Sequence, residues 1–284
     1  MIEQAEIHWH LTDKCNHGCF YCPSKYSGGK NNHTIEKYVE IIEKLQTSKY
    51  QHAKSIKWKL GGGEPLQFGG INVILKLIKS KPSFVRLDTS GGETWFETLE
   101  IRDFVDHLLV THHYWQNPSV LNFIIDFCQE NNKLLDIMVP LQPGKIRECK
   151  ALVKDIQSKN VNCHEQTLYD DQGKMIMEYS KGDLNLIKGL PEDYEEPIVN
   201  QPPPYVDLSK PPVDDTPSYT GKPCYAGVDY MFISSKGYIS GSECGGRNLG
   251  NIYSDDWIPP MDPFNCVMTY CRSSNDREKI RIIK

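Results

Sequence analysis

Three cysteines in one short segment have the spacing to hold an iron–sulfur cluster. Cys15, Cys19 and Cys22 are spaced C-x3-C-x2-C directly after an expected first strand. Thiolates select zinc or iron–sulfur clusters, and three of them can hold three corners of a cubane cluster. The fourth iron would then stay open to a chelating small molecule. A structural zinc would need a fourth ligand such as His17, but a position at the C-terminal rim of a barrel favours a catalytic cluster. We refer to residues 15–22 as the cysteine loop.

A second feature follows the second expected strand. Residues 61–64, here called the glycine turn, are Gly61, Gly62, Gly63 and Glu64. Glycines allow a ligand to come close to the backbone, and the Glu64 carboxylate can accept hydrogen bonds. An isolated triple glycine would indicate only a surface turn. Its position after the second strand, like that of the cysteine loop after the first, argues against this interpretation.

A second group of cysteines lies near the C-terminus. The chain has ten cysteines, and a reducing compartment removes the stabilising role that they play in secreted proteins. Four thiols allow closed ligation of one further cluster, and a zinc-ribbon-like structural site is the alternative. These four are Cys224, Cys244, Cys266 and Cys271.

The elements that must position these groups follow a strict alternation up to about residue 168. Apolar residues spaced three and four apart predict helices around 35–45, 121–128 and 146–156, and Asn117-Pro118 predicts a helix start. Such alternation implies parallel strands, and we expect an α/β fold, a partial (β/α)6 TIM-like barrel that stays open. The six β-type runs are residues 5–12, 55–60, 84–89, 104–111, 134–141 and 161–169.

Composition changes after residue 180. Prolines crowd the stretch from 191 to 223, which disfavours helix, so residues 181–223 are expected to form a linker or a strap over the barrel mouth. Residues 228–233 and 238–242 flank a turn with Gly237 and predict a β-hairpin. The expected domains are therefore 1–180, 181–223 and 224–284, the last a small cysteine-bearing module.

In these motifs the chain resembles the radical S-adenosylmethionine (radical SAM) enzymes. The three-cysteine motif matches the family pattern, including the aromatic Tyr21 before the third cysteine, and the glycine turn matches the family element that binds the methionyl amino group of SAM through Gly62, Gly63 and Glu64. The C-terminal module resembles the shortened SPASM module called twitch. The resemblance implies one SAM-binding [4Fe-4S] cluster, S-adenosyl-L-methionine as cofactor, and a second, auxiliary [4Fe-4S] cluster.

The resemblance also implies a reaction and further site residues. One electron passed to SAM would give methionine and a 5′-deoxyadenosyl radical, which abstracts hydrogen from a C–H bond. Ser90, after the third strand, is expected to contact SAM, and His112, after the fourth, to bond SAM or the substrate. Cys163, on the sixth strand, could donate hydrogen to a substrate radical if it faced the barrel interior. The expected electron donor is a flavodoxin or a ferredoxin.

Two substrate classes compete. One is a small polar metabolite that is oxidised or epimerised in a biosynthetic pathway, and the other is a peptide or protein side chain. Only four residues precede the first expected strand, which leaves no room for an N-terminal leader-binding domain and favours the metabolite. A hypothesis of another class is an interaction module that binds structural zinc.

Charge and hydropathy argue against nucleic acid and membranes as binding partners. The formal net charge is -5 and the pI is about 6.0, so attraction to nucleic acid or to an anionic membrane is not expected. No apolar run approaches the roughly 18 to 20 residues of a membrane span, and the first residues do not resemble a signal peptide. We therefore expect a cytoplasmic enzyme.

Overall fold

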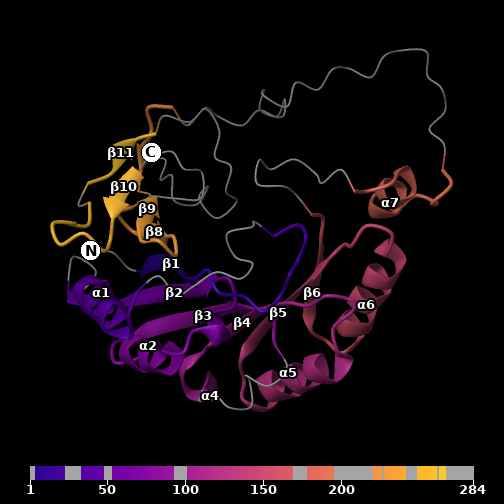
Figure 1. The fold of residues 1–284 in the computed structure, drawn as a ribbon, viewed down its shortest axis with the longest axis horizontal. Helices are drawn as coiled ribbons and strands as arrows, with labels where there is room; N and C mark the ends of the chain where they lie inside the picture. Colours follow the sequence, from indigo (N-terminus) through magenta and orange to yellow (C-terminus); the bar gives the residue numbers. More distant parts are fainter. Residues whose placement is uncertain are drawn as a thin grey trace.

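A curved sheet of parallel strands forms the centre of the fold (Figure 1). The structure, a computed structural model, describes residues 4–22, 33–47, 53–92, 101–168, 178–194, 220–225, 227–240, 248–260 and 262–266. Neighbouring strands in the barrel part pair in parallel, which confirms the predicted open partial barrel. They are β1 (Gln4–Thr12), β2 (Ser55–Gly62), β3 (Ser83–Thr89), β4 (His107–Thr111), β5 (Leu134–Pro140) and β6 (Asn162–Gln166).

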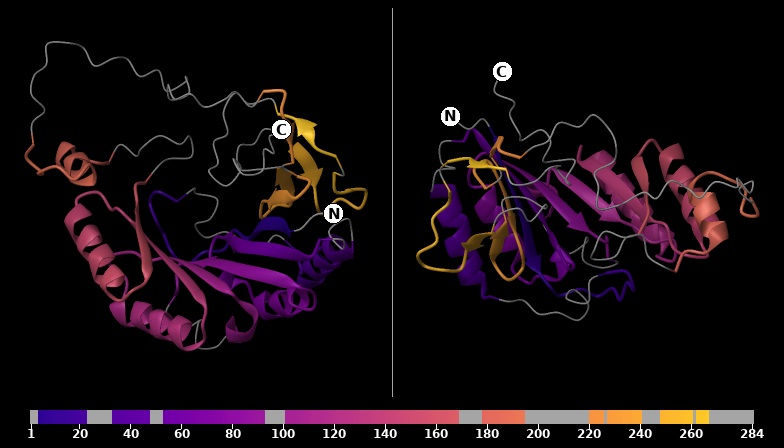
Figure 2. Two further views of the ribbon diagram at one scale, coloured as in Figure 1. Left: turned by 180° about the vertical axis from the view of Figure 1, so that it is seen from behind. Right: turned by 90° about the horizontal axis from the view of Figure 1, so that it is seen from above.

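Helices cover one face of this sheet, as Figure 1 and the view from behind in Figure 2 show. The predicted apolar stripes are the buried faces of α1, α5 and α6, and the Asn117 side chain caps α5 by accepting from the Ser119 amide. No helix in the described ranges is long and apolar enough to cross a membrane. The helices are α1 (Ile35–Thr47), the 3-10 turn η2 (Pro65–Gln67), α2 (Ile71–Ile78), α4 (Ile101–Phe104), α5 (Pro118–Glu130), α6 (Ile146–Ser158) and α7 (Lys181–Ile187).

Side chains alternate between the two faces of the sheet, and the strand register carries this alternation from β1 to β4. The row packed under the helices is apolar and buried: Trp9, Leu60, Leu87 and Leu108. The adjacent row on the other face is polar: His8, Lys59, Arg86 and His107. The helix layer therefore supplies the hydrophobic core, and the concave face of the partial barrel is free to carry chemistry.

The C-terminal hairpin extends the barrel sheet. β8 (Tyr230–Ile233) and β9 (Tyr238–Ser240) form the predicted hairpin, with Gly237 at a φ of 79° in its turn. β8 pairs in parallel with β1, and β10 (Asn248–Asn251) pairs with β9. The resulting order in the described ranges is β10-β9-β8-β1-β2-β3-β4-β5-β6. The hairpin is thus continuous with the barrel sheet, which the local sequence pattern did not indicate.

Two expected boundaries differ from the structure. The segment expected to be a linker from residue 181 begins with α7, which packs beside α6 and is fixed by a capping box at Ser180 and by an Asp183 carboxylate that accepts from the Gly144 amide. Phe104 ends α4 and does not begin a strand, since β4 starts only at His107. Residues 195–219, with most of the prolines, lie outside the described residues.

The two faces predict different responses to truncation. Leu87→Ala should lower the free energy of unfolding by about 2 to 5 kcal/mol, because Leu87 is fully buried under the helices. Leu134→Ala, also on a strand but with Leu134 57% exposed, should change it by less than about 0.5 kcal/mol. Urea unfolding followed by circular dichroism measures both, and equal losses would contradict the assigned faces.

Candidate functional site

The cysteine loop and the glycine turn line one cavity of about 290 Å³. The cavity lies where β1 to β4 end, so its wall is built from the carboxyl ends of parallel strands, the usual site of ligand binding in such sheets. Its lining residues are His8, His10, Cys15, His17, Cys19, Tyr21, Cys22, Gly61, Gly62, Gly63, Asp88, Thr89, Ser90, Thr111 and His113. Residues of both motifs therefore line one cavity.

Backbone hydrogen bonds join the two motifs. The Gly63 amide donates to the Thr12 carbonyl at 2.7 Å, and the Glu64 amide donates to the Lys14 carbonyl at 2.8 Å. Gly62 has a φ of 117°, and a Cβ there would lie 2.6 Å from the Thr12 carbonyl oxygen. Only glycine fits this approach without strain. The glycine turn thus fixes the backbone that leads into the cysteine loop.

The three thiols of the loop fit an iron–sulfur cluster. They line the same cavity as the glycine turn, and burial raises the pKa of the Cys15 and Cys19 thiols. The His17 amide donates to the Cys15 sulfur at 3.4 Å. Three such thiols are a suitable donor set for a cubane cluster, whose irons would favour the thiolate form. Among the described residues, no group of three or more His, Cys, Asp or Glu side chains is arranged to hold a single metal ion.

The imidazole of His113 lines the cavity next to Cys19. The Nε2 atom of His113 lies 3.6 Å from the Cys19 sulfur, and the Tyr21 hydroxyl lies 3.1 Å from Nε2 and 3.3 Å from Nδ1 of the same ring. The ring stacks on Trp115 with centroids 4.9 Å apart. Burial lowers the pKa of His113 to about 4, so its imidazole is neutral near pH 7. Tyr21, which the sequence analysis placed at the cofactor, is therefore in contact with His113, to which the sequence analysis assigned no role.

The expected contact of His112 with SAM or the substrate stays a prediction, and the structure places this residue outside the cavity. His112 is 3% exposed, its amide donates to the Met138 carbonyl at 2.9 Å, and its side chain does not line the cavity. Burial lowers its pKa to about 4. Of two adjacent histidines after β4, only His113 reaches the cysteine loop, and the sequence contained no signal that separated them.

The carboxylate of Glu64 has a different task from the expected one. Its Oε1 accepts from the Leu66 amide at 3.0 Å and the Thr89 hydroxyl at 2.8 Å, and its Oε2 accepts from the Ser90 amide at 2.8 Å and the Ser90 hydroxyl. A carboxylate offers about four acceptor sites, and all are used. Glu64 is 2% exposed and does not line the cavity. It ties the end of β2 to the end of β3.

Ser90 lies where the sequence analysis expected it. It lines the cavity at the end of β3, and its backbone carbonyl accepts from the Gln116 side chain at 3.2 Å. Its hydroxyl is engaged with Glu64, so contact with SAM stays a prediction for this residue.

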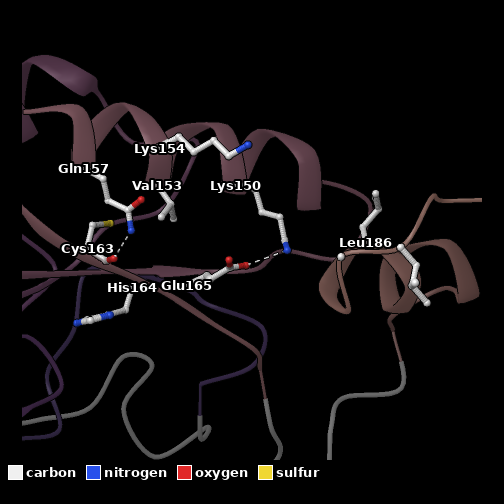
Figure 3. A pocket seen from close by; sticks show the side chains of 10 residues that line it. Lys150, Val153, Lys154, Gln157, Cys163, His164, Glu165 and Leu186 are labelled. Atoms are coloured by element: carbon white, nitrogen blue, oxygen red, sulfur yellow. Dashed lines mark hydrogen bonds and ion pairs between the residues drawn. The ribbon is translucent and has the colours of Figure 1, made fainter.

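Cys163 does not face the barrel interior. It lies on β6 and packs against α6, beside Val153 and Gln157, where the Gln157 side chain donates to the Cys163 carbonyl at 2.9 Å (Figure 3). His164 points the opposite way in the same view. Burial raises the pKa of the Cys163 thiol to about 12. The expected role as a hydrogen donor is therefore corrected, because the pleat of β6 directs this side chain into the helix layer.

The structure brings two of the four C-terminal cysteines together. Cys224 on β7 (Pro223–Cys224) pairs with Phe264 on β11 (Phe264–Asn265), and the Cys266 amide donates to the Lys222 carbonyl at 2.9 Å. Cys224 and Cys266 are buried together in one small group of side chains. This arrangement suits two ligands of a single iron–sulfur cluster. Cys244 and Cys271 lie outside the described residues.

The C-terminal module contacts the cavity directly. The Ser235 hydroxyl in the β8–β9 turn donates to the Asp13 carboxylate, two residues before Cys15. Phe232 of β8 packs edge-on against His8 and His10, which line the cavity from β1. The sequence placed the two histidines on one face, but not beside a residue more than 200 positions away.

Comparisons with solved structures place this fold. The chain is similar to Streptococcus suis SuiB bound to S-adenosylmethionine, with a TM-score of 0.51 and 17% identity over 89% of this chain and 64% of SuiB. It is also similar to anSMEcpe with bound AdoMet and Kp18Cys peptide, with a TM-score of 0.50 and 15% identity over 90% of this chain and 79% of that one. No protein-family model and no curated protein matches the chain.

These neighbours define the class of fold. At 17% and 15% identity these matches show the fold alone, which is an α/β fold with an open parallel sheet. The chain spans less than two thirds of the length of SuiB.

The saturated Glu64 carboxylate predicts a structural cost. Glu64→Ala should lower the free energy of unfolding by about 3 kcal/mol, because it leaves buried donors of Thr89, Ser90 and Leu66 without an acceptor. Glu40→Ala on the exposed face of α1 should cost less than about 0.5 kcal/mol. Denaturant unfolding compares the two, and a Glu64→Ala protein as stable as the Glu40→Ala protein would refute the assigned role.

Burial of His112 predicts a pH dependence of stability. Its folded pKa of about 4 lies below the ordinary value of 6.5, so the unfolded chain binds a proton first and stability falls as the pH drops from 6.5 towards 4. Between about pH 7 and pH 4.5, wild type should lose about 2 to 3 kcal/mol more than His112→Gln. Urea midpoints at both pH values measure this, and parallel pH profiles would contradict it.

Proposed function

We propose that this protein is a radical SAM enzyme that cleaves S-adenosylmethionine reductively and abstracts a hydrogen atom from a substrate C–H bond. The observation that carries the proposal is one cavity lined both by the three thiols of the cysteine loop and by the glycine turn, whose backbones are joined by two hydrogen bonds. When bound to these thiols, a [4Fe-4S] cluster would supply the electron that breaks the C–S bond of SAM, giving methionine and a 5′-deoxyadenosyl radical.

The chain's own residues would bind the cluster and SAM, orient SAM against the cluster and exclude water. Cys15, Cys19 and Cys22 would ligate the cluster, and the backbone of Gly62 and Gly63 would accept the methionyl ammonium group. Ser90, also in the cavity wall, would contact SAM. Burial of the site strengthens each of these polar interactions. The concave face below carries the groups that would contact the substrate, among them the Asp88 carboxylate, which the Arg86 guanidinium holds with two bonds of 2.7 Å.

We further propose an auxiliary [4Fe-4S] cluster in the C-terminal module, ligated by Cys224, Cys244, Cys266 and Cys271. Support comes from Cys224 and Cys266, whose side chains are buried together at the β7–β11 strand pair. An electron donor of the flavodoxin or ferredoxin type would deliver reducing equivalents. A reducing compartment such as the cytoplasm suits an enzyme whose thiols must stay unoxidised.

A peptide side chain is the first candidate for the substrate. The neighbouring structure of anSMEcpe contains a bound peptide, and its similarity extends over 90% of this chain. The second candidate is a small polar metabolite that is oxidised or epimerised, which the polar concave row of His8, Lys59, Arg86 and His107 supports. Three members of this row are paired with carboxylates, Lys59 with Glu6, Arg86 with Asp88 and His107 with Asp136, so the row makes the concave face polar.

Anaerobic reconstitution tests the proposed chemistry. Wild type should take up about eight iron atoms if both clusters assemble as cubanes, and it should release 5′-deoxyadenosine from SAM after reduction. Cys19→Ala should abolish 5′-deoxyadenosine formation, whereas Cys128→Ala, at a buried helix position, should retain it. Zinc content without iron, or intact clusters that leave SAM uncleaved, would refute the proposal.

Deuterium transfer distinguishes the substrate classes. A perdeuterated peptide library and a set of deuterated sugars and cyclitols would each be incubated with the reconstituted enzyme and SAM. The substrate class is the one that transfers label into 5′-deoxyadenosine, measured by mass spectrometry. Transfer from sugars alone would remove the peptide as the first candidate.

A further inference from the structure

The His113 imidazole is placed to donate a hydrogen bond to a cluster ligand. A neutral imidazole has one N–H and one acceptor nitrogen. In the tautomer with the proton on Nε2, His113 can donate to the Cys19 sulfur at 3.6 Å and Nδ1 can accept from the Tyr21 hydroxyl at 3.3 Å, while the same hydroxyl lies 3.1 Å from Nε2. This tautomer gives all three groups a suitable partner.

The ring is held in this position by its own neighbours. It stacks on Trp115 at an interplanar angle of 16°, and the His113 amide donates to the Gln116 side chain at 2.6 Å. The Gln116 side chain in turn donates to the Ser90 carbonyl at 3.2 Å. His113 is buried, so few alternative rotamers are open to it. With the proton on Nε2, the N–H therefore has the Cys19 sulfur within reach before any cluster binds.

An N–H bond to a ligating sulfur favours the reduced cluster. The electron that enters an iron–sulfur cluster adds negative charge to its sulfurs, so a donor there binds the reduced state more strongly than the oxidised state. The effect is larger in a site shielded from water. The Cys15 sulfur also receives an N–H, but from the His17 backbone, which a side-chain substitution does not remove.

We propose that His113 is a positioning residue that raises the reduction potential of the cluster by donating to the Cys19 sulfur. The proposal rests on the proposed function, because it requires a cluster on the cysteine loop. It assigns to His113 a role in setting how readily the cluster accepts its electron, separate from ligation and from contact with SAM.

Two substitutions separate the donor from the ring. His113→Phe keeps a ring that can stack on Trp115 but has no N–H, and His113→Gln keeps an N–H at a comparable reach. His112→Gln, next in the chain and outside the cavity, is the matched control. The midpoint potential of each reconstituted protein is measured by redox titration followed by electron paramagnetic resonance.

We expect the equilibrium constant for reduction to fall about tenfold or more in His113→Phe, to stay near wild type in His113→Gln, and to be unchanged in His112→Gln. An unchanged potential in His113→Phe would overturn the proposal. If His113→Phe takes up no cluster, retention of the cluster in His113→Gln supports the donor role, and its loss there overturns it. Absence of any cluster in wild type would instead refute the proposed function.

Discussion

The arrangement of the site depends on two backbone hydrogen bonds between the first two strands' ends. The amides of Gly63 and Glu64 donate to the carbonyls of Thr12 and Lys14, and this pairing fixes the start of the cysteine loop against the glycine turn. A side chain at position 62 would meet the Thr12 carbonyl, so the contact requires glycine. The cavity, its thiols and its ligand-facing backbone all follow from this close approach.

The rest of the sheet keeps that contact in place. Buried apolar side chains hold the helices against one face, and Glu64 ties β2 to β3 through four hydrogen bonds. The C-terminal hairpin adds a parallel partner to β1 and reaches the loop through Ser235 and Asp13. The module that carries the second group of cysteines is thereby bonded directly to the segment before Cys15.

The sequence predicted what local patterns and spacing determine. Six parallel strands, the helix stripes, the Asn117 cap and the β-hairpin are confirmed, because each is encoded within one short window. The pairing of β8 with β1 was missed, since it joins residues more than 200 positions apart and no period marks it.

The candidate site shows the same division. The cysteine loop and the glycine turn, which the resemblance assigned to binding the cluster and SAM, line one cavity. His112 was preferred over His113, and the role of Cys163 was left to depend on whether it faced inward, because the sequence does not show which face each of two adjacent residues takes. Glu64 was assigned to a ligand because the partners that saturate it, Thr89 and Ser90, come from another strand.

The central claim is that the three thiols of the cysteine loop leave one iron open to S-adenosylmethionine. Electron–nuclear double resonance on the reduced, reconstituted protein, with SAM labelled by 15N in the amino group and 17O in the carboxylate, tests it most directly. The account predicts hyperfine coupling of both labels to the cluster, as expected for direct chelation. An intact cluster that shows coupling to neither label would contradict it.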